Sequence, residues 1–371
     1  MSSFRISVIS PSFSGGGAEE VAKRWADGLR ALGNEVDEVC LSQLTDVDSS
    51  KSQSLFFRLF PKFLVQVFLL RSKLGHCQNQ VVISLLPLTN LKVWLSTLFL
   101  HSKPILIFSE HSIPSQLIEF QSRKNRILTP FAWSIYRYAD LVLAPSHAAA
   151  ANLIGVSSTK RGRVKVIQNP AILEVLPRIS KHINQGFKDS RTDTVRLIVA
   201  GRLSIEKNPI LSISVAEILR HNFSQSVEIV YLGEGPLEAD LVNHANLLNI
   251  SITIHAWSSN WTHLISSNTV LLHCSSSEGF GNVILNAANH GIPTVAYSGA
   301  LGVADAVIPG ITGYLAISYS AEDFAEGIMK VKDLKIPPIE NWLTLFTQEQ
   351  VALRIQKLIE EISSQRNLRN G

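Results

Sequence analysis

The sequence alternates short apolar strands with helices, and it does so in two successive series. The first series contains six predicted strands, at residues 4–10, 35–41, 80–86, 104–110, 140–146 and 163–170. The second contains five, at residues 194–203, 227–235, 252–257, 269–274 and 293–299. Because parallel strands need a long crossover that a helix usually supplies, this alternation predicts an α/β protein with parallel sheets covered by helices.

The two series also predict two doubly wound domains. The 371 residues, of which 46% are hydrophobic, are enough to form two cores. A polar segment at residues 178–193 separates the series, and we interpret it as part of a linker. We place an N-terminal domain at residues 1–177 and a C-terminal domain at residues 190–346. We expect a final helix, at about residues 347–371, to pack back on the first domain.

The charge and hydropathy patterns exclude several classes of protein. A net charge of +4 without a concentrated basic run does not indicate a nucleic-acid partner. The chain enters its first strand directly, without a signal peptide, and no run of about 18 uncharged apolar residues is present. We therefore expect a cytoplasmic protein.

Ligands of open parallel sheets bind beyond the carboxyl ends of the strands, so the loops there carry the candidate site. The run Gly15–Gly17 follows the first strand at a helix start, where free N–H groups suit phosphate, although a purely structural turn is the alternative. Arg202 and Lys207 follow the first strand of the second series. Such a pair can bind phosphate, and two solvated cations are the alternative.

A second loop of the C-terminal half carries an acid just before a predicted helix. The amides of Gly279 to Val283 begin this helix, whose dipole favours negative charge. Glu278 at that position is better explained by hydroxyl groups or a developing positive centre than by an anion. Gly281 permits close backbone approach. Asn286, eight residues after the acid, is expected in the second helical turn, facing the mouth of the loop.

Two features of the N-terminal half have a functional and a structural interpretation. His111 ends the fourth strand at the edge where ligands bind, but it is equally a candidate structural histidine. Residues Leu55–Leu74 combine bulky apolar side chains with a polar side that includes Lys62, Gln66 and Lys73. This composition is typical of an interfacial membrane helix, and a core-packed helix is the alternative.

Seven segments in this order resemble the retaining family 4 glycosyltransferases, which include bacterial lipopolysaccharide and capsule enzymes. The segments are GGGAEEVAKRWADGLRALGNEV, FSEHS, VKVIQNP, AGRLSIEKN, YLGEGP, SSSEGFGNVILNAANHGIPTVA and PGITGYL. The resemblance implies the GT-B fold, in which two Rossmann-like domains face each other across a cleft. It also implies that the N-terminal domain binds the acceptor and the C-terminal domain binds a nucleotide-diphosphate sugar.

The resemblance assigns the charged candidates to the reaction. Arg202 and Lys207 match the basic pair that neutralises the donor diphosphate. Glu278 matches the first acid of the family's paired-acid motif, near the transferred sugar. His111 matches the histidine of the acceptor domain that lies near the donor sugar. No metal and no cofactor are implied.

The glycine-rich segments match backbone that contacts the donor. Gly16 and Gly17 match the loop that approaches the distal phosphate. The donor-binding backbone of the second loop corresponds to Gly279, Phe280, Gly281, Asn282 and Val283. Position 286 matches the second acid of the motif, which binds the ribose hydroxyls, but an asparagine stands there. An amide has one acceptor oxygen where a carboxylate has two, so donor binding is expected to be weaker.

The expected function is the transfer of a sugar, UDP-linked in our expectation, to a glycan or a polyprenyl- or other lipid-linked acceptor in surface polysaccharide or lipopolysaccharide assembly. Peripheral contact with the inner face of the cytoplasmic membrane goes with such acceptors. A non-catalytic GT-B subunit is the alternative that Asn286 permits. A nicotinamide-dependent dehydrogenase shares the fold class, but the glycine spacing at Gly15–Gly17 does not match the dinucleotide fingerprint.

Overall fold

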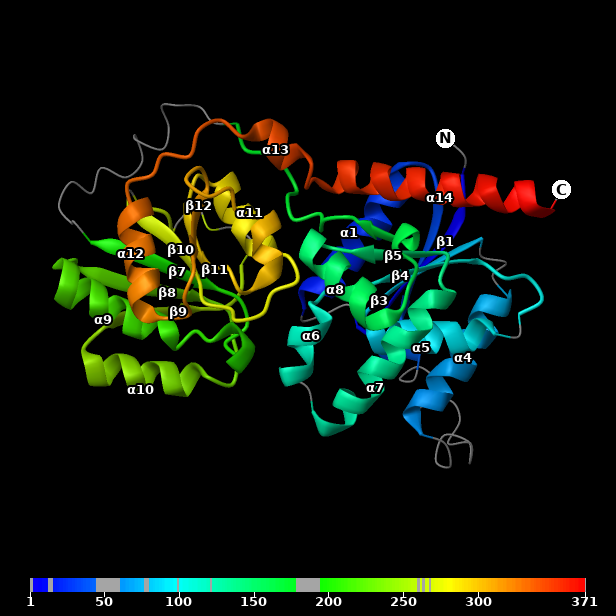
Figure 1. The fold of residues 1–371 in the computed structure, drawn as a ribbon, viewed down its shortest axis with the longest axis horizontal. Helices are drawn as coiled ribbons and strands as arrows, with labels where there is room; N and C mark the ends of the chain where they lie inside the picture. The colour runs from blue at the N-terminus through cyan, green and yellow to red at the C-terminus, as the bar shows by residue number, and fades with distance from the viewer. Residues whose placement is uncertain are drawn as a thin grey trace. The chain divides into compact units, whose positions relative to one another are not determined.

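The computed structural model divides into two compact units (Figure 1). Unit 1 comprises Met1–Pro170 and Phe346–Gly371, and unit 2 comprises Ala171–Leu345. The predicted linker and Gly15 lie outside the residues that the structure describes. The described residues are 3–12, 16–44, 61–76, 80–98, 100–120, 122–177, 194–258, 261, 264–266 and 268–370.

Unit 1 is built on a six-stranded sheet in the order β2-β1-β3-β4-β5-β6, with every pairing parallel. Its strands are β1 (Arg5–Ser10), β2 (Glu35–Cys40), β3 (Val81–Leu85), β4 (Ile105–Ser109), β5 (Leu141–Ala144) and β6 (Val164–Val166). Its helices are α1 (Gly17–Ala31), α4 (Lys62–His76), α5 (Pro87–Thr97), α6 (Pro114–Leu117), η1 (Ile118–Phe120), α7 (Arg123–Ser134), η2 (Ile135–Tyr138), α8 (His147–Ser157), η3 (Arg161–Arg163) and α14 (Gln348–Asn370).

Unit 2 repeats this plan with the sheet order β12-β11-β10-β7-β8-β9, again with every pairing parallel. Its strands are β7 (Val195–Ala200), β8 (Val227–Leu232), β9 (Ser251–His255), β10 (Thr269–His273), β11 (Thr294–Tyr297) and β12 (Gly313–Ala316). Its helices are η4 (Ile205–Lys207), α9 (Leu211–Phe223), α10 (Glu238–Leu248), α11 (Asn282–Asn289), η6 (Leu301–Asp305), α12 (Ala321–Val331) and α13 (Glu340–Thr344).

The predicted α/β class with two parallel sheets is confirmed. The central strands β3 and β10 are buried at every position, as expected for strands covered by helices on both faces. The strand order reverses between β1 and β3 in one sheet and between β7 and β10 in the other. Helices leave the two strands of such a switch point toward opposite faces, which opens a crevice at their carboxyl ends.

Strand β12 was not predicted. It has four residues, GYLA, and begins with a glycine, so it lacks the run of β-branched residues that predicts a strand. It forms because it extends the parallel sheet beside β11, where Gly313 pairs with Thr294.

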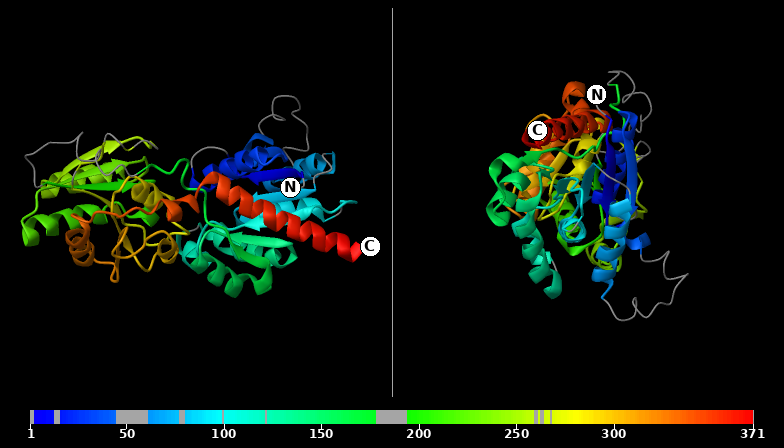
Figure 2. Two further views of the ribbon diagram at one scale, coloured as in Figure 1. Left: turned by 90° about the horizontal axis from the view of Figure 1, so that it is seen from above. Right: turned by 90° about the vertical axis from the view of Figure 1, so that its right-hand side faces the viewer.

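The final helix α14 packs on unit 1 (Figure 2). Val351, Ile355 and Ile359 are fully buried in the cluster that contains Trp25 and Leu29 of α1. Burial of these aliphatic side chains contributes roughly 1.5–3 kcal/mol each, which holds a helix from the end of the chain against its beginning.

The helix predicted near Leu55–Leu74 is α4, and its part before Pro61 lies outside the described residues. The predicted polar side is wrong at Gln66, which is buried and donates a 2.9 Å hydrogen bond to the carbonyl of Leu41. The exposed side instead carries Lys62, Leu64 and Phe68. Among the described residues, no helix is long and apolar enough to cross a membrane.

Candidate functional site

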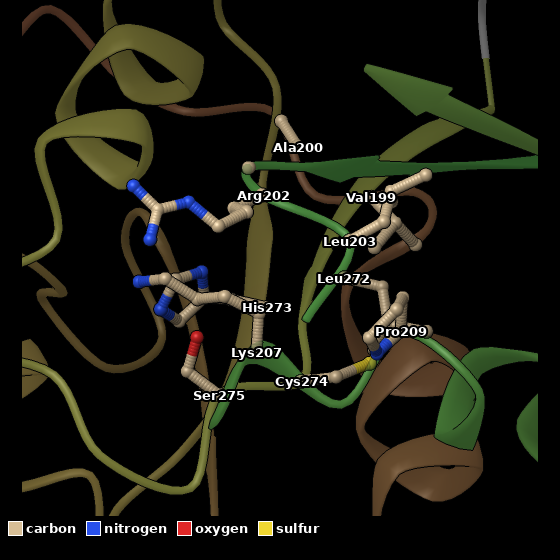
Figure 3. A pocket seen from close by; sticks show the side chains of 11 residues that line it. Val199, Ala200, Arg202, Leu203, Lys207, Pro209, Leu272, His273, Cys274 and Ser275 are labelled. Atoms are coloured by element: carbon tan, nitrogen blue, oxygen red, sulfur yellow. The ribbon is translucent and has the colours of Figure 1, made fainter. Parts of the chain in front are cut away.

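The switch point of unit 2 holds a pocket at the carboxyl ends of β7 and β10. Its empty volume is about 250 Å³, including open solvent at its mouth. Figure 3 shows the polar ends of Arg202, Lys207, His273 and Ser275 gathered on one side of this pocket, with apolar side chains on the other. The sequence predicted that Arg202 and Lys207 would meet near a strand end, and the structure brings both to this pocket.

Lys207 and Glu278 form an ion pair at the edge of the pocket. Lys207 Nζ lies 2.5 Å from Glu278 Oε2, although the two residues are 71 positions apart. The same oxygen lies 3.3 Å from Nε2 of His273, whose side chain is 4% exposed. Two nitrogen groups therefore converge on Oε2 of a single carboxylate.

This arrangement keeps Glu278 charged. Burial alone would raise its pKa, but the Lys207 ammonium and the His273 imidazole outweigh burial and hold the pKa of Glu278 well below its usual range. The ionised carboxylate can accept hydrogen bonds from hydroxyl groups. Lys207, by contrast, is available to an incoming anion only if its contact with Glu278 loosens.

A chain of hydrogen bonds fixes the loop that carries Lys207. Asn208 has a left-handed backbone, with φ of 40°, and its amide donates to the Tyr319 hydroxyl at 3.0 Å. That hydroxyl donates in turn to the carbonyl of Cys274 at 2.7 Å. Because Cys274 directly follows β10, the β7 loop and the β10 loop are fixed relative to each other.

The loop after Glu278 leads into α11 as the sequence predicted. Gly281 is the residue before the helix and has φ of 103°, a conformation that side chains of L-residues rarely adopt. Phe280 is 1% exposed, so it offers only its backbone to a ligand. Gly279 is buried, and the side chains of Asn282 and Val283 in the first turn are partly exposed.

Gly302 supports this loop from the other side. Its N–H donates to the carbonyl of Glu278 at 3.1 Å. A Cβ atom added at Gly302 would lie 2.3 Å from the backbone of Gly279 and 2.4 Å from the carbonyl oxygen of Glu278. The close approach therefore requires glycine at position 302.

Asn286 lies in the second turn of α11, and its side chain is partly exposed. Its carbonyl is engaged within the helix by the imidazole of His290, at 2.8 Å. The amide side chain has no hydrogen-bond partner among the residues that the structure describes. It is therefore available to a ligand.

The candidate residues of unit 1 are less charged. His111 is the second residue after β4, and its Nε2 lies 3.0 Å from the hydroxyl of Ser109. The ring is half-buried against Trp25, with ring centroids 5.7 Å apart. Burial lowers the pKa of His111 to about 4, although Asn169 opposes the shift. The imidazole is therefore neutral at physiological pH.

The glycine loop after β1 begins α1 as predicted. Gly16 is the residue before the helix and Gly17 is its first residue, and both are accessible. The first turn also contains Glu19, which accepts a 3.1 Å hydrogen bond from Ser12.

Three residues of these sites were not predicted. They are His273, Gly302 and Glu110, the last of which precedes His111 in the sequence. Two of them could have been found from the sequence, because His273 and Glu110 are polar residues at the end of an apolar run. Gly302 had no such signal, because its partner loop is more than 20 positions away.

Comparison with known families gives matches over both units. The profile for glycosyl transferases group 1 matches residues 181–341, and the profile for glycosyltransferase family 4 matches residues 15–175.

Two characterised proteins are similar in sequence. The Arabidopsis thaliana sulfoquinovosyl transferase SQD2 is 28% identical over 212 residues, which cover 54% of this chain and only 40% of the plant protein. An enzyme of Campylobacter jejuni subsp. jejuni serotype O:2 is 23% identical over 385 residues, which cover 93% of this chain and 98% of that enzyme. It is described as GalNAc-alpha-(1->4)-GalNAc-alpha-(1->3)-diNAcBac-PP-undecaprenol alpha-1,4-N-acetyl-D-galactosaminyltransferase.

The fold is also similar to solved structures. Anabaena HepE in complex with UDP-glucose has a TM-score of 0.66 and 18% identity, with 99% of this chain and 100% of HepE covered. Together with the two parallel sheets, this similarity confirms the predicted GT-B fold of two Rossmann-like domains.

Proposed function

Because the chain belongs to the group 1 and family 4 glycosyltransferases, we propose that it moves a sugar from a UDP-linked donor to a lipid-linked glycan with retention of configuration. The observation that carries this proposal is the cluster of Arg202, Lys207 and ionised Glu278 at the switch point of unit 2. It offers cations for a diphosphate and, beside them, an acceptor for sugar hydroxyls.

The proposed reaction breaks the bond between C1 of the sugar and the diphosphate oxygen. Negative charge grows on that oxygen, and Arg202 stabilises it together with Lys207, whose ion pair with Glu278 loosens when the diphosphate binds. The acceptor hydroxyl forms its bond to C1 on the face that the diphosphate leaves, and its proton passes to the departing phosphate oxygen. Retention results because the new bond replaces the old one on the same face.

Glu278 has a supporting part in this scheme. Its Oε2 is held by Lys207 and His273, so the carboxylate orients sugar hydroxyls and does not attack C1. No divalent metal takes part in the proposed reaction. Among the described residues, no three His, Cys, Asp or Glu side chains gather as metal ligands, and Arg202 with Lys207 supplies the positive charge.

The UDP donor and the lipid-linked acceptor are supported by the relatives. HepE is a structural neighbour that was solved with UDP-glucose, and the Campylobacter relative acts on an undecaprenol-linked glycan. An acceptor of this kind is consistent with the role in surface polysaccharide or lipopolysaccharide assembly that we propose.

The test is a screen of UDP-, GDP- and ADP-sugars with synthetic polyprenyl-diphosphate glycans, in the presence and absence of EDTA. We expect release of UDP only, an unchanged rate with EDTA, and a product whose anomeric configuration by NMR equals that of the donor. An inverted product, or a rate restored only by Mg²⁺ or Mn²⁺, contradicts the mechanism. Nucleotide binding without any transfer favours the non-catalytic subunit.

Contact with a membrane surface is a further part of the proposal. Helices α4, α5 and α7 pack in sequence along unit 1 and contain no Asp or Glu (Figure 1). Leu64 and Phe68 of α4 are 46% and 59% exposed, and Ile127 and Phe131 of α7 are 76% and 56% exposed. Bulky apolar side chains on acid-free, basic helices suit the interface of an anionic membrane.

Vesicle sedimentation tests this surface. Replacing Leu64 and Phe68 by Asn is expected to release the protein from phosphatidylglycerol vesicles. The matched control is Leu247→Asn in unit 2, where the side chain is 78% exposed and the change leaves unit 1 intact. Equal release by both variants, or no binding by the wild type, contradicts the membrane contact.

A further inference from the structure

Glu110 is a fully buried carboxylate at the carboxyl end of β4, and five donors surround it. Its Oε1 accepts from the backbone N–H of His111 at 3.0 Å, the backbone N–H of Ser112 at 3.2 Å and the Ser112 hydroxyl at 2.6 Å. Its Oε2 accepts from the Trp133 indole at 2.8 Å and the Tyr136 hydroxyl at 3.2 Å. The two oxygens therefore serve different parts of the fold.

The Oε2 side connects Glu110 to the body of unit 1. The Tyr136 hydroxyl accepts a 2.7 Å hydrogen bond from the side chain of Asn90 and donates its own proton to Glu110. Asn90 accepts in turn from Ser84 at 2.7 Å. A chain of buried hydrogen bonds thus runs from the end of β3 through α5 to the carboxylate.

The Oε1 side determines the path of the chain after β4. Both backbone amides that follow Glu110 point at one oxygen, which forces a tight turn at His111. The imidazole is then steadied by Ser109, the last residue of the strand, and by the ring of Trp25. No other carboxylate among the described residues makes side-chain hydrogen bonds to the backbone amides at this turn.

We propose that Glu110 is a positioning residue for sugar transfer: its carboxylate fixes the turn that presents the His111 imidazole to the donor sugar. This inference rests on the function proposed above. Glu110 does not itself contact substrate, because it is 0% exposed and both of its oxygens accept from protein donors. Its effect on the reaction passes through His111.

The variants separate the two oxygens of Glu110. Glu110→Gln places an NH₂ group against donors, because an amide keeps only one acceptor oxygen. Ser112→Ala removes one donor to Oε1 and loosens the same turn without changing charge. Tyr136→Phe is the matched control, since it removes a donor to Oε2 and leaves the His111 turn intact. Each variant is made alone and in a His111→Ala background.

The first readout is the imidazole NMR signal of His111 in histidine-labelled protein, assigned by its loss in His111→Ala. We expect Glu110→Gln and Ser112→Ala to move this signal and Tyr136→Phe to leave it in place. This readout needs no activity, so it decides the placement of His111 even if the proposed transfer reaction is absent. A signal that moves equally in all three variants reports a general structural role and overturns the inference.

The second readout is kcat for transfer. A misplaced reacting group costs up to roughly 100-fold, so Glu110→Gln is expected to lower kcat by about 10- to 100-fold, with a smaller change in the donor KM. In the His111→Ala background this loss should largely vanish, because both changes act through one imidazole. If the fold-losses in kcat of Glu110→Gln and His111→Ala multiply in the double variant, the inference is overturned. Normal turnover in His111→Ala alone overturns the proposed role of His111.

Discussion

The two units of this protein share one architecture but present different chemistry at the same edge of the sheet. Unit 2 gathers Arg202 and Lys207 in a charged pocket at its switch point, and Glu278 forms an ion pair with Lys207 there. Unit 1 instead presents a neutral, half-buried His111, whose backbone N–H donates to the buried Glu110. The fold therefore fixes where a ligand can bind, and the residues at the strand ends decide what kind of ligand it is.

The difference also concerns how each site is held. In unit 2 the charges stabilise one another, since Lys207 and His273 both face Glu278. In unit 1 the acid Glu110 is buried, and its oxygens accept hydrogen bonds from two backbone amides and three side chains of the protein. We infer that unit 2 contributes binding energy for a charged donor and that unit 1 contributes geometry.

Removing a cation from unit 2 is expected to have the largest effect. Arg202→Ala removes a group that stabilises charge on the leaving phosphate, so kcat/KM should fall by roughly 10²- to 10³-fold. The control is Lys335→Ala, an exposed cation of the same unit that lies outside the pocket. A kinetic assay in which both variants match the wild type would show that the pocket does not bind the donor.

A substitution at Asn286 tests whether this residue binds the ribose of the donor. Asn286→Glu supplies two acceptor oxygens for two ribose hydroxyls, so the donor KM should fall by up to about tenfold, or about 1.4 kcal/mol, with kcat nearly unchanged. Donor titrations of the two proteins side by side measure this. An unchanged KM would mean that position 286 does not contact the ribose.

The smallest expected effect distinguishes the two sites by their response to acid. Folding lowers the pKa of His111 from 6.5 to about 4, so the unfolded chain binds a proton first as the pH falls. The free energy of unfolding should therefore decrease from about pH 6.5 down to about pH 4. Because the ring is partly exposed, we expect a loss of only about 1 kcal/mol between pH 7 and pH 5.

Other histidines also titrate in this range, so the measurement compares thermal unfolding of the wild type and His111→Gln at pH 7 and pH 5. The variant should lose less stability on acidification. Glu278, whose pKa is depressed, stays ionised over the whole interval and contributes nothing to this difference. Identical acid losses in the two proteins would mean that His111 is not protected from protonation in the fold.

The sequence predicted the location of both sites better than their contacts. Strand ends are readable from apolar periodicity, which is why Arg202, Lys207, Glu278 and His111 could be placed. The contact between Lys207 and Glu278 joins residues 71 positions apart, and it exists only because β7 and β10 are neighbours in the sheet. The order of strands in a sheet cannot be predicted from the local pattern of apolar residues.

Gln66 and Glu110 show that a local sequence pattern does not predict the partners of a buried polar side chain. A helical wheel counts Gln66 as polar and exposed, but a buried amide is stable where it donates to a carbonyl such as that of Leu41. No role was predicted for Glu110, which the sequence placed only at the end of a strand. Its five donors come from α7, η2 and the following turn, which meet only in the folded unit.

The central claim is that Lys207 binds the donor diphosphate while Glu278, its ion-pair partner, binds the sugar. Calorimetric titration of UDP into the wild type, Lys207→Ala and Glu278→Gln tests it most directly, because UDP carries the diphosphate without the sugar. Lys207→Ala should weaken UDP binding by about 1.5–3 kcal/mol, the range for a charge-assisted contact. Glu278→Gln should bind UDP at least as tightly as the wild type, since it frees Lys207, and yet lose transfer activity. Equal weakening by both variants, or by neither, would contradict this division of roles.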